Sequence, residues 1–373
     1  MTRLRDLGLS VGQLPPGPLN AITDIAGVRV GSVTLIDGDG PLVVGQGPIR
    51  TGVTVIVPHE RIGLSPVFAG THTLNGNGEM TGLEWVRESG QLTTAIGITN
   101  THSVGTVRDG LVAADMAERN ARGSFWSLPV VAETYDGALN DINGMHVTTH
   151  HVQEALANAT DGPVAEGNVG GGTGMICHEF KGGTGTASRL VGTWHVGALV
   201  QANYGNRERL AIDGVPVGLA IPRSVVPSAW DDEEAVARAG AGSIIVILAT
   251  DAPLLPHQLT RLAQRAGLGI ARMGGSGGHS SGDIFFAFST ANAGALTSYK
   301  AESAGEPLTV SMLHDGEITQ LFWGAIESTE EAICNALVAA DTMTGRDGVT
   351  AHALPHDALV EAMTRHSRGP APP

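Results

Sequence analysis

Residues 240–248 read GAGSIIVIL, a serine between a glycine-rich turn and an unbroken apolar run. The apolar run 244–248 predicts a strand buried on both faces, because its residues are β-branched or aliphatic and none is polar. Ser243 therefore carries a hydroxyl at the first position of a buried strand. Gly242 before it can adopt backbone angles that other residues avoid, so the hydroxyl can approach the preceding carbonyl group.

A serine in this position suggests a nucleophile that the chain generates by cutting itself. An N-to-O acyl shift at Ser243, followed by hydrolysis, would break the bond between Gly242 and Ser243. Ser243 would then carry a free α-amine beside its hydroxyl, which puts a nucleophile and a possible base in one residue. The alternative is that this Gly-Ser pair only begins a strand, as many such pairs do.

The composition indicates a globular protein and argues against several kinds of partner. The chain has 373 residues, of which 42% are hydrophobic and 16% charged, so a sizeable core is expected. A net charge of −15 and an aromatic content of 4% argue against binding to nucleic acid or to anionic membranes. Two cysteines provide neither a disulfide framework nor a zinc pattern. We expect a cytoplasmic protein, because no secretory signal or membrane-spanning segment is evident.

Strand and helix patterns occur throughout the chain without a low-complexity linker or a fixed repeat, which predicts one domain over residues 1–373. Long apolar strands together with apolar-faced helices predict an α/β or α+β sandwich with buried sheets. The expected strands are 27–35, 51–58, 93–100, 192–200, 283–289 and 308–312. The expected helices are 109–120, 151–157, 232–239, 258–266 and 329–342, the last with a capping box formed by Ser328 and Glu331.

Three further polar segments are candidates for chemistry. In the glycine-rich stretch 274–285, Ser281 and Asp283 are spaced to lie on one face of an extended segment, where the acid could orient the hydroxyl for proton transfer. Glu133 and Tyr135 follow an apolar run and could hold a substrate ammonium and an oxyanion. Asn203 lies in the segment 201–205 at the end of the strand predicted at 192–200 and could donate to an oxyanion. For each segment the alternative is a polar turn at a strand end.

Three other patterns point to no site of their own. The run 167–174 lacks the ending of a phosphate-binding loop and the context of a dinucleotide site, so we interpret it as closely packed backbone. His146, His150 and His151 have no matching carboxylate or cysteine pattern and are expected at the surface, so no metal or other cofactor is predicted. No Gly-x-Ser-x-Gly elbow is present, which argues against an α/β-hydrolase.

Taken in order, these segments resemble the DmpA-type self-processing aminopeptidases, which include the L-aminopeptidase/D-esterase and the β-peptidyl aminopeptidases. No single motif is specific, but the ordered set covers nearly the whole chain. It comprises GPLNAITD (17–24), GVRVG (27–31), RTGVT (50–54), NTHS (100–103), ETYDG (133–137), GNVGGGTG (167–174), QAN (201–203), GS (242–243), SGDI (281–284) and GRDG (345–348).

The resemblance implies a precursor that is cut between Gly242 and Ser243 into fragments 1–242 and 243–373, which remain associated. It implies a four-layer αββα sandwich, with helices outside two sheets, that looks like the N-terminal-nucleophile hydrolases but is differently connected. Family members usually assemble as a tetramer of processed pairs, so a homo-oligomer is expected. The implied substrates are small peptides, amides or esters.

The resemblance also implies roles for the candidate residues. Ser243 matches the nucleophile and Asn203 the oxyanion-hole asparagine. Ser281 and Asp283 match the helper serine and carboxylate, although some members have Glu at the second position. The other two matches are Tyr135, which would assist binding or the oxyanion, and Glu133, which would hold the substrate's amino terminus.

Several choices stay open at this point. The base is either the Ser243 amine, whose unperturbed pKa is about 8, or Ser281 oriented by Asp283. Substrates with L-α-amino, D-alanyl or β-amino ends are all compatible, and Trp126, Trp194 and Phe285 are candidates for the pocket wall. Two other classes remain. One is an acyltransferase of the ornithine acetyltransferase type, which uses threonine instead of serine, and the other is a catalytically silent assembly protein.

Overall fold

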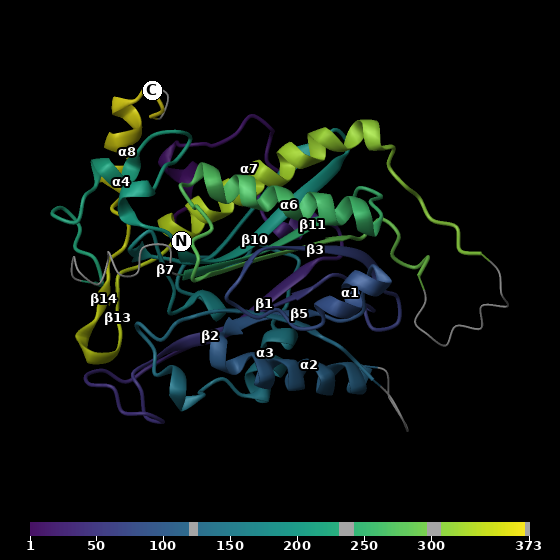
Figure 1. Cartoon of the computed structure of the whole chain (residues 1–373), viewed down its shortest axis with the longest axis horizontal. Coiled ribbons are helices and arrows are strands. Elements are labelled where there is room, and N and C mark those ends of the chain that lie inside the picture. The colour runs from purple at the N-terminus through teal and green to yellow at the C-terminus, as the bar shows by residue number, and fades with distance from the viewer. Residues whose placement is uncertain (119–125, 231–241, 297–306, 370–373) are drawn as a thin grey trace.

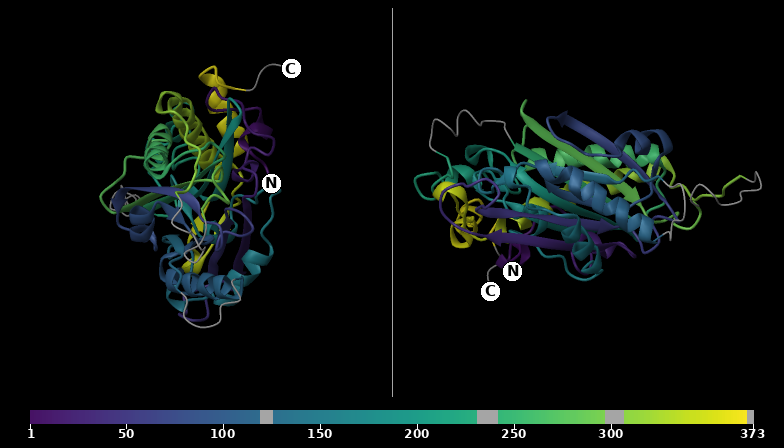
Figure 2. Two further views of the ribbon diagram at one scale, coloured as in Figure 1. Left: turned by 90° about the vertical axis from the view of Figure 1, so that its right-hand side faces the viewer. Right: turned by 90° about the horizontal axis from the view of Figure 1, so that it is seen from below.

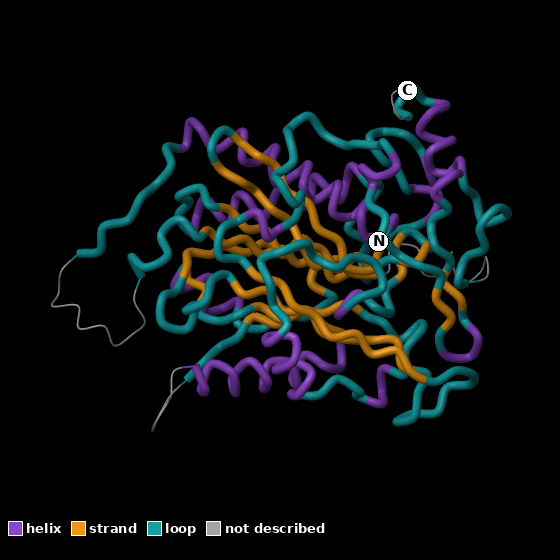
Figure 3. The backbone as a smooth tube through the Cα atoms, turned by 180° about the vertical axis from the view of Figure 1, so that it is seen from behind, coloured by secondary structure: helices purple, strands orange, loops and turns teal. Residues whose placement is uncertain are grey.

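The chain folds into four layers, with two stacked β-sheets between two layers of helices (Figure 1). The structure is a computed structural model and describes residues 1–118, 126–230, 242–296 and 307–369. Seen from behind, the strands occupy the middle of the molecule, and helices lie above and below them (Figure 3). This arrangement is the predicted αββα sandwich.

The larger sheet has six strands in the order β4-β3-β12-β11-β10-β9. The strand β11 is antiparallel to β10 and parallel to β12. Their bounds are β3 (Val67–Gly76), β4 (Gln91–Leu92), β9 (Gly183–Val191), β10 (Trp194–Tyr204), β11 (Gly242–Thr250) and β12 (Ser281–Ser289). The strand that begins at Gly242 therefore lies in the centre of this sheet, as its apolar sequence predicts.

The smaller sheet has four strands in the order β1-β2-β5-β6. Two short hairpins lie outside the sheets, β7 (Ile176–Cys177) with β8 (Phe180–Lys181), and β13 (Met343–Thr344) with β14 (Thr350–Ala351). The bounds of the sheet strands are β1 (Arg29–Asp37), β2 (Ile49–Val57), β5 (Ile96–Asn100) and β6 (Val130–Thr134).

Helices cover the outer face of each sheet. The six-stranded sheet packs against α6 (Pro256–Arg272) and α7 (Ile318–Val338), and the four-stranded sheet packs against α2 (Val104–Glu118) and α3 (Thr149–Ala157) (Figure 2). Shorter helices in the described residues are α1 (Leu83–Ser89), α4 (Val217–Ala220) and α8 (His356–Arg365).

Alternate residues of β11 face two different cores. Ile245 and Ile247 belong to the core between the two sheets, whereas Ile244 and Val246 belong to the core under α6 and α7. This follows from the twofold side-chain period of a strand that is covered on both faces. Because Ser243 is two residues before Ile245 on the strand, its side chain lies on the same face, toward the smaller sheet.

The glycine run 167–174 forms closely packed backbone between the sheets, as predicted. A Cβ on Gly170, Gly171 or Gly172 would contact Thr54, Gln201 or Thr184 respectively, because the 3₁₀ turn 170–172 is enclosed by strands of both sheets. Glycine is required there because no side chain fits.

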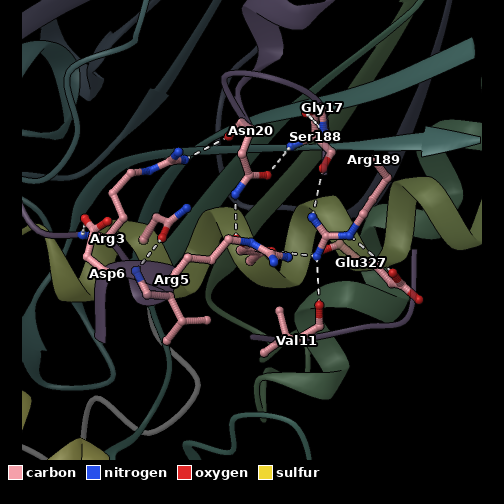
Figure 4. A network of polar contacts seen from close by, with 12 residues as sticks. Arg3, Arg5, Asp6, Val11, Gly17, Asn20, Ser188, Arg189 and Glu327 are labelled. Carbon is pink, nitrogen blue, oxygen red and sulfur yellow. Dashed lines mark hydrogen bonds and ion pairs between the residues drawn. The ribbon is translucent and has the colours of Figure 1, made fainter. Parts of the chain in front are cut away.

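A buried ionic network joins the N-terminal segment to α7 (Figure 4). The guanidinium of Arg189 on β9 pairs with Glu327 and Glu331 of α7, and it also donates to the Val11 carbonyl oxygen. Arg5 pairs with the same Glu331. Segments far apart in sequence are thus held together by charge-assisted hydrogen bonds.

Most of the predicted elements are present, and two predictions are wrong. Residues 308–312 form no strand, because Leu308 and Met312 are exposed and the segment pairs with no sheet edge. The last long helix begins at Ile318, so Ser328 lies inside it and donates to the Ala325 carbonyl oxygen instead of capping. The predicted helix 232–239 lies outside the described residues.

Candidate active site

A pocket of about 650 Å³ lies where β11 and β12 begin and where β6 and β10 end. Five of the residues singled out in the sequence line it: Glu133, Tyr135, Asn203, Gly242 and Ser243. The pocket therefore gathers side chains from both sheets, over more than one hundred positions of sequence.

Strand register sets the position of Ser243. It lies opposite Asn203 in the antiparallel pair β10–β11 and beside Gly282 in the parallel pair β11–β12. Gly242 has a φ of 123°, and a Cβ there would contact the carbonyl oxygen of Asn203. Only glycine suits this backbone, which confirms the conformational role expected of Gly242.

The Ser243 hydroxyl lies against the peptide group that precedes it. Its Oγ donates to the carbonyl oxygen of Gly242 at 2.7 Å and accepts from the backbone N–H of Gly282 at 3.2 Å. The hydroxyl is thus held beside the bond that an N-to-O acyl shift would break. The second hydrogen bond fixes the rotamer of Ser243 in the intact chain.

Ser281 and Asp283 interact with each other, as their spacing predicts. Ser281 Oγ donates to Asp283 Oδ1 at 2.7 Å, and the N–H of Ile244 donates to the same oxygen at 3.2 Å. Asn75 fixes the backbone of Asp283 by accepting its N–H at 2.9 Å. Burial raises the pKa of Asp283, although these hydrogen bonds act in the opposite direction.

The Ser281–Asp283 pair and the Ser243 side chain lie on opposite faces of the sheet. Along β12, Ser281, Asp283 and Phe285 are spaced by two residues, so their side chains lie on one face. Phe285 belongs to the core under the helices. Ser243 has no hydrogen bond to either side chain in the intact chain. The pair thus lies on the strand next to the one that carries Ser243. The hydrogen bond from the N–H of Ile244 to Asp283 connects the pair to the residue that follows Ser243.

Asn203 is oriented by two backbone groups. Its Oδ1 accepts from the N–H of Ile176 at 2.8 Å, and its Nδ2 donates to the carbonyl oxygen of Tyr135 at 3.0 Å. The amide N–H groups are therefore directed to the side on which Tyr135 lines the pocket. The ring of Tyr135 packs over Gly137, where a Cβ would contact its hydroxyl.

Glu133 is a buried carboxylate that also lines the pocket. Its Oε1 accepts from the N–H of Glu79 at 2.9 Å, and its Oε2 accepts from the hydroxyl of Thr101. Burial raises the pKa of Glu133, and these two hydrogen bonds lower it. Oxygen acceptors of this kind can bind an ammonium group.

Several lining residues were missed in the sequence. Trp230, Ile176, Glu179 and Glu79 reach the pocket, whereas the predicted wall residues Trp126, Trp194 and Phe285 do not line it. Phe285 lies instead in the core under α6 and α7. Thr101 and His102 also line the pocket, and the parallel pairing of β5 with β6 explains why, since it brings the end of β5 beside that of β6. The polar segment NTHS (100–103) at the end of a predicted strand could have indicated Thr101 and His102 as pocket residues.

Within the parts of the chain that the structure describes, no group of His, Cys, Asp or Glu side chains could hold a metal ion. His146 instead forms a hydrogen bond with Asp141 at 2.9 Å. Among the same residues, no helix has both the length and the apolar character needed to cross a bilayer.

Comparison with known proteins identifies the family. The model of peptidase family S58 matches residues 20–351. The chain belongs to peptidase family S58. It is an aminopeptidase, and the resemblance derived from the ordered motifs is confirmed.

Relatives of known activity and structure agree with this assignment. The β-peptidyl aminopeptidase BapA of Sphingosinicella microcystinivorans is 50% identical over 377 residues, which cover 98% of this chain and 93% of the relative. The solved β-aminopeptidase of Burkholderia sp. is 53% identical with a TM-score of 0.89, over 100% of both chains.

The L-aminopeptidase D-Ala-esterase/amidase of Ochrobactrum anthropi is similar throughout as well. It is 44% identical with a TM-score of 0.86, over 98% of this S58 chain and 99% of the solved one. That structure is described as a prototype for the serine aminopeptidases and as a new variant among the Ntn hydrolase fold. The predicted fold class is therefore confirmed, and the comparisons favour hydrolysis over the acyltransferase alternative.

Proposed function

We propose that this S58 aminopeptidase cuts itself between Gly242 and Ser243 and then uses Ser243 to release N-terminal residues from small peptides, amides and esters. The observation that carries the proposal is the position of the Ser243 hydroxyl, 2.7 Å from the carbonyl oxygen of Gly242 and opposite Asn203 in the pocket. Fragments 1–242 and 243–373 would be the products. β-Amino acids are among the proposed N-terminal residues, since two of the relatives above are β-aminopeptidases.

The proposed reaction is acyl transfer through an acyl-enzyme. Ser243 Oγ attacks the first carbonyl carbon of a substrate whose ammonium is held by Glu133, and the amide N–H groups of Asn203 stabilise the oxyanion. The amine leaving group departs with a proton, and water then attacks the ester and restores the hydroxyl. Tyr135, which lines the same pocket, assists binding of the substrate or of the oxyanion.

The α-amine released on Ser243 is the favoured base. It belongs to the same residue as the nucleophile, whereas Ser281 and Asp283 lie on the other face of the sheet in the intact chain. An α-amine with a pKa of about 8 can accept a proton near neutral pH. Asp283, which accepts the N–H of Ile244, would position the new chain end.

Denaturing mass spectrometry of freshly purified protein tests the proposed cut. Two masses that meet between Gly242 and Ser243 are expected, and a single mass of the intact chain in active protein would contradict it. Amino-acid p-nitroanilides with L-α-, D- and β-amino ends would then define the substrate. The matched acceptor assay, in which a free amino acid is offered to the acyl-enzyme, separates hydrolysis from acyl transfer.

The Asp283→Asn variant should fold and turn over substrate more slowly. Asparagine keeps the volume and an oxygen that can accept the N–H of Ile244, but it lacks the charge that orients Ser281. We expect kcat to fall by about 10²-fold, the lower end of a general acid–base contribution. Asp109→Asn, at an exposed position of α2, is the control. Unchanged kinetics in Asp283→Asn would remove Asp283 from the mechanism.

The pH dependence of substrate binding should report Glu133. Burial raises its pKa, so the carboxylate takes up a proton at a higher pH than an ordinary glutamate does. Because only the ionised form attracts the substrate ammonium, KM should rise as the pH falls through this raised pKa. In Glu133→Gln, KM should be high at every pH. The rise of KM at low pH, which is the acid limb of the profile, should disappear.

The control for this experiment is Glu84→Gln, which removes an exposed carboxylate from α1. It should keep both the wild-type KM and the acid limb. An acid limb that persists in Glu133→Gln would assign the titration to a different group.

We further propose that the processed pairs assemble as a homo-oligomer, a tetramer on the family pattern, in the cytoplasm. The proposed assembly rests on the family resemblance. Light scattering coupled to size-exclusion chromatography gives the mass of the assembly, and cell fractionation gives its location.

A further inference from the structure

Lys181, at the end of β8, is a buried lysine without a carboxylate partner among the residues that the structure describes, and burial lowers the pKa of its ammonium to about 7. It is one of two lysines in a chain with twenty arginines, and the other is Lys300. Its Nζ donates to the carbonyl oxygens of Met175 and Gly182, both at 2.8 Å, and lies 3.5 Å from that of Gly172. The compact ammonium suits three carbonyl oxygens around one point, which a planar guanidinium does not.

The carbonyl of Met175 leads from Lys181 to the pocket. It belongs to the same peptide group as the N–H of Ile176, and that N–H donates to Asn203 Oδ1 at 2.8 Å. Asn203 in turn donates from Nδ2 to the carbonyl oxygen of Tyr135, a residue that lines the pocket. Ammonium, peptide group and side-chain amide thus form one chain of hydrogen bonds that runs from Lys181 to Asn203, which lines the pocket.

Hydrogen bonds in such a chain strengthen one another. A positive charge on the carbonyl oxygen of a peptide group polarises the group and makes its N–H a better donor. The amide of Asn203 is polarised in the same way when its Oδ1 accepts that N–H, so its Nδ2–H becomes a better donor to an oxyanion. Burial leaves the charge of Lys181 unscreened by solvent, but it also lowers the pKa of the ammonium to about 7, so the effect is strongest below that pH.

A second cation, Arg223, holds the same hairpin at its turn. It forms two hydrogen bonds with Glu179 in the turn between β7 and β8, at 2.7 and 2.8 Å. His178 and Glu179 have positive φ values of 48° and 63°, a conformation that residues with side chains adopt only under constraint. Arg223 therefore supports the shape of the hairpin, which makes it a comparison for Lys181.

We propose that Lys181 is a positioning residue for the oxyanion site, acting on Asn203 through the Met175–Ile176 peptide group. This rests on the proposed role of Asn203. Removal of the ammonium should weaken the interaction with the oxyanion, and the binding of the uncharged substrate carbonyl should change little. The effect is thus expected on kcat and not on KM.

A double-mutant cycle between Lys181→Met and Asn203→Ala tests this proposal. Asn203→Ala should lower kcat by about 10²- to 10³-fold, as loss of an oxyanion-hole donor does. Lys181→Met should lower kcat by about 10-fold with KM within about twofold of the wild type. The double variant should be no slower than Asn203→Ala alone, because the ammonium has no amide left to act on. The first-order rate of chain cleavage is measured in parallel.

The control is Arg223→Met. Its fold-loss in kcat should multiply with the fold-loss caused by Asn203→Ala when the two substitutions are combined. The same multiplication in the Lys181 cycle would overturn the proposal, since it would show that Lys181 acts independently of Asn203. If Lys181→Met does not fold, Lys181→Gln enters the same cycle, and failure of both variants to fold would equally overturn it. A wild-type protein that is neither cut nor active would contradict the proposed function itself, which is a distinguishable result.

Discussion

The Ser243→Ala variant should remain a single chain of 373 residues and show no aminopeptidase activity. The substitution removes the one oxygen that lies 2.7 Å from the carbonyl oxygen of Gly242, so no ester can form there and the chain cannot be cut. It also removes the nucleophile of the mature enzyme. We expect kcat to fall by about 10⁶-fold, the size of loss seen when a hydrolase loses its serine nucleophile.

Denaturing mass spectrometry and p-nitroanilide hydrolysis, on the same preparation, measure the two effects. The matched control is Ser10→Ala, which removes a hydroxyl from an exposed position outside the pocket and should be cut and fully active. Circular dichroism should show the same fold in both variants, because alanine fits the site of Ser243 without a clash. A Ser243→Ala protein that is cut, or that hydrolyses substrate at the wild-type rate, would exclude Ser243 as the nucleophile.

Local sequence was sufficient to predict the strand that carries Ser243 and its conformationally special neighbour. The apolar run 244–248 leaves no polar face, so the strand had to be covered on both sides, and it lies between two cores. Gly242 could be assigned an unusual backbone conformation because it is a glycine next to Ser243, and its φ of 123° agrees. The spacing of Ser281 and Asp283 likewise predicted the hydrogen bond between them.

What the sequence could not provide were facts about pairing between distant segments. No local pattern places Ile176 beside Asn203, because their contact depends on where the β7–β8 hairpin packs. The opposite faces of Ser243 and the Ser281–Asp283 pair follow from the register of β11 with β12, which no single strand encodes. The alternating segment 308–312 failed for a related reason, since alternation produces a strand only where a partner edge exists.

The same long-range pairing bears on how the proposed fragments stay together. A cut after Gly242 would leave β10 in one fragment and β11 from Ser243 onward in the other, although eight of the nine residue pairs between the two strands lie beyond the cut. It would also divide the buried ionic network, with Arg5 and Arg189 in the larger fragment and Glu331 in the smaller one (Figure 4). Hydrogen bonding and charge pairing both cross the proposed fragment boundary, so separation would expose strand edges and unpaired charges.

Arg189 is the member of this network whose loss should cost the most. Its side chain is fully buried, and it contacts Glu331 at 2.7 Å and Glu327 at 3.2 Å. Arg5 and Asn20 also contact Glu331, so that carboxylate keeps partners when Arg189 is removed. Among the described residues, Glu327 keeps only the backbone N–H of Leu14 as a partner and would be left as a buried carboxylate without a cation.

The Arg189→Met variant should therefore lower the free energy of unfolding by about 3–5 kcal/mol, the usual cost of breaking a buried ion pair from one side. Urea unfolding measures this best in the Ser243→Ala background, where the chain is expected to be uncut and its unfolding does not depend on concentration. Arg365→Met breaks an exposed pair with Glu361 on α8 and should cost less than about 1 kcal/mol. Equal, small losses in the two variants would show that the network adds little to stability.

The pH dependence of the same variant provides a further test. Arg5 and Arg189, together with hydrogen bonds, hold the pKa of Glu331 below its ordinary value despite burial. A depressed carboxyl pKa contributes stability above the unfolded pKa, and this contribution is lost as the pH falls through the folded one. Because Arg189→Met removes one of the lowering charges, the pKa of Glu331 should rise and the acid loss of stability should begin at a higher pH. An unchanged acid limb would show that Arg5 and Asn20 alone keep Glu331 ionised.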